Sequence, residues 1–441
     1  MPGTFRSSFG KFFMLALLLG ALGAISAAET PSNDEWFPIL AWGPTVWFTP
    51  EGRELTQRDF DLMKECGFTI AGFAPLKHLD MIARAGLKTY CWDDPLADAK
   101  RLDGGIDSAV CSKLVADAVA KVRGRPEVIG FFLRDEPVAR SFRGLGALSA
   151  EIRRQAPHLV PYINLYPNTV SSKHLGCSYE EYLKQYTETC NMPFLSYDFY
   201  SLPADRHAPI SDRYWLNLEQ ARNAAERAGI KFYYCTLGVT MFNHRQPTLD
   251  DLNFEIYSAL LYGAKGLAIF TYFTPPIGNY REAAISEFGE RTRVWYDLQK
   301  VLKSVHNRAA LLNDLKSVAV YHIPRVSREQ GTRGPDERSL LVGVSNDPDA
   351  RFAVGEFVHR STGQVYIMIL NKDLNVSRPI DLKWRNAPPA KVEINPASRK
   401  NVWHLLTGEE CWIAPGHAHL LRVSGLKVRC GRTFPPFRHK R

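Results

Sequence analysis

The chain has 441 residues, of which 45% are hydrophobic and 23% are charged. This composition excludes a disordered or collagen-like chain, and the length allows one large domain together with a smaller one. The formal net charge is +9, but six basic residues lie in the acid-free tail 425–441, so no nucleic-acid-binding surface is expected.

The first 28 residues have the features of a secretory signal peptide. Arg6 and Lys11 precede the apolar run FFMLALLLGALGAISAA, which ends in the small residues Ser26, Ala27 and Ala28. The run is shorter than the roughly 20 residues of a membrane-spanning helix, and no later stretch is long and apolar enough to span a bilayer. We therefore expect residues 1–28 to be removed, leaving a secreted or periplasmic protein without a membrane span.

From residue 36 onwards, short apolar segments alternate with segments of helical periodicity, several of which stop at a glycine. Strands that alternate with helices predict a parallel sheet with right-handed crossovers. Eight repeats predict a (β/α)8 TIM barrel over 29–314, because roughly 250 residues is typical of that fold. The predicted strands are 37–44, 68–75, 87–94, 128–137, 159–167, 194–202, 230–239 and 266–275.

A doubly wound open sheet is the alternative arrangement of the same units. It would normally carry a glycine-rich phosphate loop after the first strand, and WGPTVWFTPEG (42–52) is not such a loop. The barrel is therefore favoured.

The pattern changes in the last quarter of the chain. Six segments alternate apolar and polar residues and are separated by turn residues, which predicts an antiparallel β-sandwich domain over 315–424. The remaining segment, 425–441, is basic and is expected to be a disordered tail.

Eight cysteines show neither a CxxC pair nor the spacing of a zinc site, and no cluster of metal ligands is evident, so no metal and no cofactor are expected. Cys177 and Cys190 flank one helix-like segment and could form a disulfide. The others are expected to be small buried hydrophobic residues.

Polar and aromatic residues gather at the predicted strand ends, where a barrel of this kind carries its reactive groups. Acids, amides and aromatic rings together suit a polyhydroxylated ligand, so a carbohydrate substrate is expected. The candidate substrate-binding residues are Trp42, Asp93, Asn164, Tyr166, Tyr197, Tyr200 and Tyr272.

The segment GFFLRDEPVA (130–139) ends a strand on two adjacent acids, Asp135 and Glu136. Crowded carboxylates raise each other's proton affinity, so one of them can stay protonated near neutral pH and act as a general acid. Cleavage of a glycosidic bond needs such a proton donor. Because Glu has the longer reach, we assign the acid role to Glu136. The structural alternative is that the pair binds Arg134 or caps the next helix.

A second carboxylate normally faces the proton donor across the sugar ring. Asp198, which ends the apolar segment LSYDFY, is our candidate, with Asp93 and Asp94 in reserve. Asp135 is expected to orient Glu136 or to bind a sugar hydroxyl. The three candidate catalytic residues are thus Glu136, Asp135 and Asp198.

The segments GFFLRDEP, PYINLYPN, LSYDFYSL and GLAIFTYFTP, with the trailing β domain, resemble retaining glycosidases whose fourth strand ends in Asn-Glu-Pro. Within that group the chain looks most like the family 42 glycoside hydrolases of the β-galactosidase type and related secreted bacterial proteins. This resemblance implies a glycoside hydrolase with Glu136 as the acid/base residue.

The sequence departs from that family at two positions. The family's nucleophile is a glutamate that ends strand seven, where this chain has Cys235 and Thr236, and Asp135 replaces the usual asparagine. Three explanations stay open. Another acid such as Asp198 supplies the second carboxylate, or the Asp135–Glu136 pair acts as in substrate-assisted N-acetylhexosaminidases, or the barrel binds glycans without cleaving them.

Overall fold

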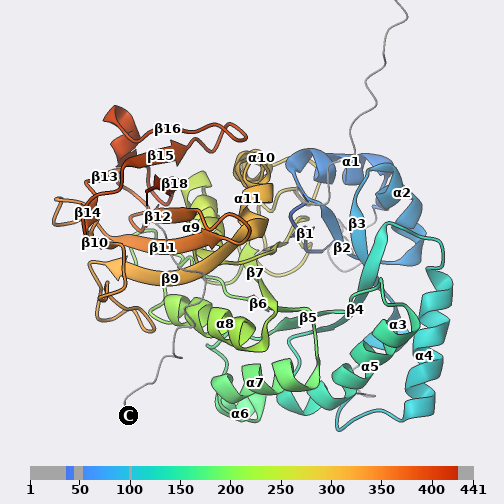
Figure 1. The fold of residues 1–441 in the computed structure, drawn as a ribbon. Coiled ribbons are helices and arrows are strands. Elements are labelled where there is room, and N and C mark those ends of the chain that lie inside the picture. The colour runs from blue at the N-terminus through green and yellow to red at the C-terminus, as the bar shows by residue number, and fades with distance from the viewer. Residues whose placement is uncertain (1–35, 44–52, 99–101, 426–441) are drawn as a thin grey trace, which may run out of the picture.

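The computed structural model describes residues 36–43, 53–98 and 102–425 (Figure 1). The expected signal peptide lies outside these residues, as does the expected tail beyond Gly425. In the part of the chain that is described, no helix is both long and apolar enough to cross a membrane.

Eight parallel strands form a closed barrel in the order of the sequence, and β8 pairs with β1 to close it. This confirms the predicted (β/α)8 barrel. The strands are β1 (Ile39–Ala41), β2 (Ile70–Ala74), β3 (Lys88–Trp92), β4 (Val128–Asp135), β5 (Tyr162–Leu165), β6 (Phe194–Asp198), β7 (Lys231–Leu237) and β8 (Leu267–Phe270).

Helices cover the outside of the barrel, and glycines end two of them as the sequence predicts. Gly67 follows α1 and Gly229 follows α8, both with positive φ (+108° and +67°), a conformation that glycine adopts without steric cost. The helices are α1 (Gln57–Cys66), α2 (Leu79–Arg84), α3 (Asp94–Ala97), α4 (Ser108–Lys121), α5 (Phe142–Gln155), α6 (Ser172–Leu175), α7 (Tyr179–Thr189), α8 (Tyr214–Ala228), α9 (Leu249–Leu261), α10 (Arg293–His306) and α11 (Ala309–Asp314), with short 3₁₀ helices at Leu76–His78, Ala139–Ser141 and Gly408–Cys411.

The chain then forms a six-stranded antiparallel sheet in the order β16-β15-β18-β12-β11-β9, and two short two-stranded sheets, β10–β14 and β13–β17. This confirms the predicted C-terminal antiparallel domain. The strands are β9 (Leu315–Ile323), β10 (Leu341–Gly343), β11 (Phe352–His359), β12 (Val365–Asn371), β13 (Arg378–Pro379), β14 (Lys383–Trp384), β15 (Lys391–Asn395), β16 (His404–Leu405), β17 (Trp412–Ile413) and β18 (Ala418–Ser424).

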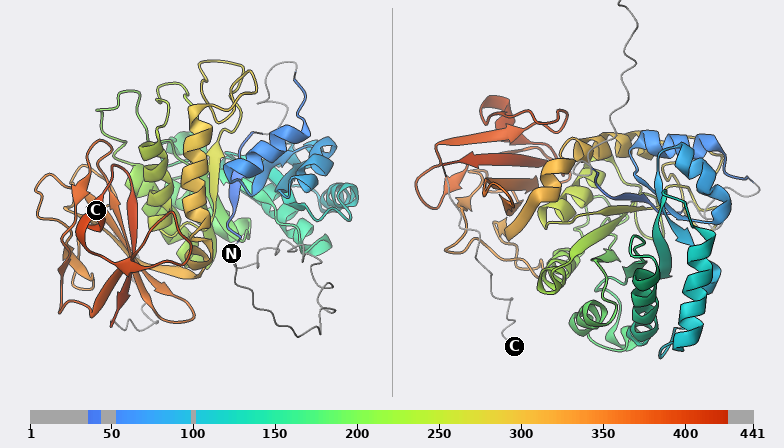
Figure 2. Two further views of the ribbon diagram at one scale, coloured as in Figure 1. Left: turned by 90° about the horizontal axis from the view of Figure 1, so that it is seen from above. Right: turned by 45° about the vertical axis from the view of Figure 1, so that its right-hand side comes forward.

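The large sheet is apolar on both faces. One face, which includes Phe357 and Met368, shares a continuous core with the barrel helices, while the other face, which includes Val354 and Ile367, packs on the short sheets. The domain therefore lies directly against α8 to α11, on the side of the barrel opposite α3 to α5 (Figures 1 and 2).

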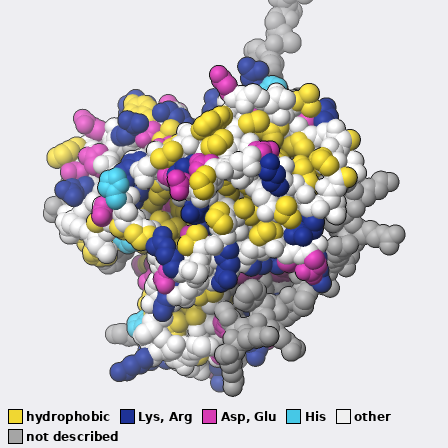
Figure 3. Space-filling view, turned by 90° about the vertical axis from the view of Figure 1, so that its left-hand side faces the viewer, with side chains coloured by type: hydrophobic (Ala, Val, Ile, Leu, Met, Phe, Trp, Pro, Cys, Tyr) yellow, Lys and Arg dark blue, Asp and Glu magenta, His cyan; other side chains and the backbone are white. Residues whose placement is uncertain are grey.

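Basic and acidic side chains are interspersed on the face that carries the C-terminal domain (Figure 3). The seven described cysteines are free thiols, including Cys177 and Cys190, so the disulfide considered from the sequence is not formed between them. Most of the seven are buried, as expected of small hydrophobic residues.

Candidate active site

A β-bulge near the end of β4 decides which acid faces the barrel axis. Phe132 pairs with Tyr162, but Asp135 pairs with Asn164, so β4 contains one more residue than β5 between these two pairs. Because successive side chains of a strand point to opposite faces, the extra residue reverses the alternation and turns Asp135 to the side of Asn164. Asp135 is exposed at the mouth of the barrel.

Glu136 follows the bulge with a left-handed backbone, φ +46°. Such a conformation costs a residue other than glycine on the order of 1 kcal/mol or more, and it is common at functional sites. The Glu136 N–H donates to the carbonyl oxygen of Asn164 at 2.8 Å, which fixes the turn against β5. The strand thus delivers two adjacent acids to one mouth, with Glu136 half-buried.

Asn164 connects the acids of β4 and β6. Its Nδ2 donates to Asp135 Oδ1 at 3.2 Å and to Asp198 Oδ1 at 3.1 Å. Asn164 and Asp198 are only 2% and 7% exposed. Since an amide nitrogen has two hydrogens, both of its donors are used on carboxylates.

A chain of hydroxyl groups inside the barrel fixes the orientation of this amide. Ser196 Oγ donates to Asn164 Oδ1 at 2.9 Å, and Tyr162 OH lies 2.8 Å from Ser196 Oγ. Because the single Ser196 proton goes to Asn164, the Tyr162 hydroxyl must donate to Ser196. The hydrogen bonds from Tyr162 through Ser196 to Asn164 therefore all run toward Asp135 and Asp198.

Burial and mutual repulsion favour the protonated forms of the three acids. Burial, followed by the charges of Asp198 and Asp135, raises the pKa of Glu136 well above its usual range. Burial and the Asp135 charge also raise the pKa of Asp198, although hydrogen bonds from Asn164 and Tyr200 oppose this effect. Burial raises the pKa of Asp135 too, to about 6, although the hydrogen bond from Asn164, the charge of Arg134 and the backbone N–H of Glu136 oppose this effect.

Tyr166 and Tyr200 lie beside these acids. Burial and then the charges of Glu136 and Asp135 raise the pKa of Tyr166, whose hydroxyl is 3.1 Å from His174 Nε2. Burial and then the Asp198 charge raise the pKa of Tyr200. Both rings are partly exposed, so they can touch a ligand bound over the carboxylates.

Trp42 lies deeper, at the floor of the mouth. It is 5% exposed and meets the rings of Phe73, Phe132 and Tyr162 edge-on, with centroid distances of 4.7, 6.2 and 6.4 Å. These aromatic residues fill the upper part of the barrel interior. The carboxylates therefore stand on an apolar floor, which limits their hydration.

Three predicted substrate-binding residues point away from the mouth. Asp93 accepts from Lys121 Nζ on α4 at 2.6 Å, and Tyr197 and Tyr272 are fully buried among the helices that surround the barrel. For Asp93 and Tyr197 the reason is the alternation of side chains along a strand. Asp93 follows Trp92, and Tyr197 lies between Ser196 and Asp198, and these neighbours point to the barrel axis. Sequence position at a strand end does not by itself reveal the side on which a side chain lies.

Strand β7 provides no acid at the axis. Cys235 faces the barrel interior, whereas Thr236 points outward and donates to Glu255 on α9. Glu255 is fully buried and also accepts from the backbone N–H and hydroxyl of Ser201, which follows β6. This carboxylate therefore ties together the ends of β6 and β7, which carry the mouth.

Sequence reasoning missed Ser196, Tyr162 and Glu255. For the first two, a signal exists in the spacing, since each lies two residues before a site residue, Asp198 or Asn164, and so on the same face of its strand. For Glu255 the signal is an isolated acid among apolar residues on a buried helix.

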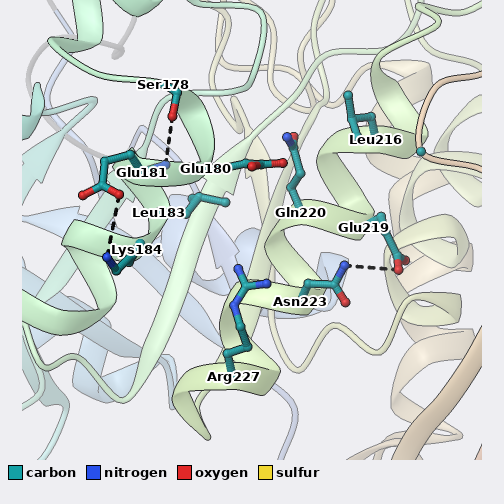
Figure 4. Close-up of a pocket in the computed structure, with 11 residues that line it drawn as sticks. Ser178, Glu180, Glu181, Leu183, Lys184, Leu216, Glu219, Gln220, Asn223 and Arg227 are labelled. Atoms are coloured by element: carbon teal, nitrogen blue, oxygen red, sulfur yellow. Dashed lines mark hydrogen bonds and ion pairs between the residues drawn. The ribbon is translucent and has the colours of Figure 1, made fainter. Parts of the chain in front are cut away.

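A hollow of 380 Å³ lies away from these acids, on the outer surface between α7 and α8 (Figure 4). Its polar side chains pair largely with one another, as Lys184 does with Glu181 and Asn223 with Glu219. It is not at the C-terminal ends of the strands, where barrels carry their chemistry. We assign it no part in the site.

Two solved structures have a similar fold along most of their length. One is a glycoside hydrolase of family 5 from Bacteroides vulgatus, 11% identical, with a TM-score of 0.53 over 91% of this chain and 93% of that chain. The other is described as a glycoside hydrolase, 11% identical, with a TM-score of 0.52 over 88% and 93%. No family model matches the chain, and no curated protein matches its sequence. At this identity the likeness shows a common fold, a barrel followed by a β domain.

Proposed function

We propose that this protein is a secreted glycoside hydrolase in which Glu136 is the general acid/base residue. The observation that carries the proposal is the cluster of Glu136, Asp135 and Asp198 at the C-terminal mouth of the barrel, joined by Asn164. Its acids differ in hydration and have raised pKa values, which is how an enzyme keeps one carboxyl protonated near neutral pH. The fold shared with two glycoside hydrolases agrees with this assignment.

In the proposed reaction, Glu136 gives its proton to the glycosidic oxygen while the bond from that oxygen to the anomeric carbon breaks. Asp198 faces the positive charge that develops on the sugar ring. Water then adds to the anomeric carbon, and its proton returns to Glu136. Asp135 binds a sugar hydroxyl through its exposed oxygen, and Tyr166 and Tyr200 contact the ring of the substrate.

The finer proposal is a β-galactosidase-like specificity, which rests on the sequence resemblance to family 42. The role of Asp198 is also specific to this chain, because β7 lacks the glutamate that serves as nucleophile in that family. The proposed export of the protein from the cytoplasm rests on the signal-peptide pattern of residues 1–28.

The test is hydrolysis of a panel of aryl β-glycosides, with the galactoside first, and of plant and algal oligosaccharides by the purified full chain. Glu136→Gln should lower kcat at least about 100-fold, since a positioned proton donor contributes that much. Glu180→Gln, an exposed acid on α7, is the matched control and should keep full activity. Hydrolysis that survives in the Glu136→Gln variant would refute the role of this residue.

Two other outcomes would replace the proposal. Turnover limited to N-acetylhexosaminides and blocked by a thiazoline inhibitor would mean that Asp135 and Glu136 use the acetamido group of the substrate. Binding of oligosaccharides without any hydrolysis would define a glycan-binding barrel.

A further inference from the structure

A row of aromatic rings leads from the carboxylates to the outer rim of the mouth. Tyr200, beside Asp198, stacks on Phe270 at a centroid distance of 5.8 Å. Phe270 is followed by Tyr280 at 6.3 Å, and Tyr280 by Phe242 at 6.0 Å. The rings come from the ends of β6 and β8 and from the loops after β7 and β8, which project from the same end of the barrel (Figure 2, left).

The outer end of this row is unusually exposed for apolar residues. Phe242, Ile277 and Phe288 are 70%, 68% and 80% exposed, more than any other large hydrophobic residue in the described part of the chain. All three lie in the loops that follow β7 and β8. Single exposed apolar residues are common on proteins, but a group at the rim of a site marks a surface for binding.

Hydrogen bonds fix the backbone of Phe242 at this exposed position. Asn279 Nδ2 donates to the Phe242 carbonyl at 2.8 Å, and the Phe242 N–H donates to Asn279 Oδ1 at 2.8 Å. A second pair of bonds joins Thr240 and Arg281, at 2.9 and 3.2 Å. The two loops therefore form one ladder, and Phe242 adopts φ +47° within it.

Packing does not account for this arrangement. An aromatic side chain gains stability when it is buried, yet Phe242 is left in water and in a left-handed backbone that disfavours a bulky residue. A ligand that covers the ring restores the apolar burial that the folded chain does not provide. Neighbouring rings of the row are 5.8 to 6.3 Å apart, so they contact one another and form a continuous apolar strip, and flat apolar rings stack on the C–H faces of sugars.

We infer that Tyr200, Phe270, Tyr280 and Phe242 form a binding track for successive sugar units of an oligosaccharide. This inference rests on the proposed function for the identity of the reaction, and it adds the substrate class, a glycan of several units rather than a single glycoside. Tyr200 contacts the unit next to the carboxylates, and Phe242 contacts the most distant one. Asn279 acts as a positioning residue for Phe242.

The experiment measures how affinity depends on chain length. The inactive full chain, Glu136→Gln, is titrated by calorimetry with cello-, xylo-, manno- and galacto-oligosaccharides of one to five units. We expect one series to bind more tightly up to about four units. Phe242→Ala on the same background should weaken the longest ligand about tenfold, by loss of apolar contact, and leave the monosaccharide within twofold. Asn279→Ala should give a smaller loss in the same direction.

Trp412→Ala, which removes an exposed ring on β17 of the C-terminal domain, is the matched control and should change neither affinity. Affinity that does not grow with chain length in any series overturns the inference, as does a Phe242→Ala effect equal for short and long ligands. A change of molar mass on light scattering in Phe242→Ala would also overturn it, because the rim would then be a contact between copies of the chain.

The outcome also separates this inference from the proposed function. If aryl glycosides are hydrolysed in a Glu136-dependent way but oligosaccharide affinity does not depend on chain length, only the binding track is refuted. If oligosaccharides bind more tightly with increasing length but none is hydrolysed, only the enzyme assignment is refuted.

Discussion

Replacement of Asn164 by alanine tests the idea that one amide organises the acids of the mouth. The change removes two hydrogen bonds to carboxylates, at 3.2 and 3.1 Å, while the backbone bond from Glu136 to the Asn164 carbonyl survives. Because these distances are long, we take the lower value for a bond to a charged group, about 1.5 kcal/mol each. At 1.36 kcal/mol per pKa unit, the pKa values of Asp135 and Asp198 should each rise by roughly one unit.

The assay is the pH dependence of kcat/KM on the best substrate of the aryl glycoside panel. The acidic limb, which reports a carboxylate that must be ionised, should move upward by about one pH unit, so kcat/KM on that limb falls about tenfold. Asn168→Ala is the matched control. Asn168 is also buried and donates to Gln220, but it does not contact these acids, so its loss should lower stability and leave the limb in place. An unchanged limb in Asn164→Ala would refute the proposed coupling.

Two further predictions concern stability. The folded protein keeps the proton of Glu136 at pH values where the unfolded chain, with a pKa near 4.5, has released it, so wild-type stability falls as pH rises through this window. Glu136→Gln does not titrate and should be more stable in urea, with an advantage that grows by up to about 1.4 kcal/mol per pH unit between pH 5 and 8; a constant advantage would contradict the raised pKa. Gly130→Ala would place a Cβ 1.6 Å from the Val160 carbonyl oxygen and should cost about 3 kcal/mol or more, whereas Gly334→Ala, with its nearest contact at 3.9 Å, should be neutral in the same thermal melt. Equal melting temperatures of the two variants would contradict the packing of β4 on β5.

The architecture could be predicted because it is written in periodic features. Alternation of apolar runs with helical segments indicates parallel strands, and glycines such as Gly67 and Gly229 mark helix ends through a conformation that other residues avoid. The change to two-residue alternation near residue 315 likewise indicates an antiparallel sheet.

The site could be predicted only in part, for two physical reasons. A bulge adds a residue without any local sequence signature, and the bulge in β4 decides that Asp135 turns toward Asn164. The orientation of Tyr197, by contrast, follows from the sequence. It lies between Ser196 and Asp198 on one strand, so its side chain must point the opposite way, toward the helices. The left-handed backbone of Glu136 depends on contacts with β5, which are far away in the sequence.

Helix α9 lies between the barrel and the large sheet, and every residue from Asp251 to Leu261 is buried. It packs against β7 on one side and β11, β12 and β18 on the other, and the approach is so close that a Cβ on Gly355 would come within 2.6 Å of the Leu261 carbonyl oxygen. A fragment ending before β9 would expose to water the face of this helix that the large sheet covers. The appended domain is therefore not a detachable module, and engineering that exchanges it for another would have to redesign α9 as well.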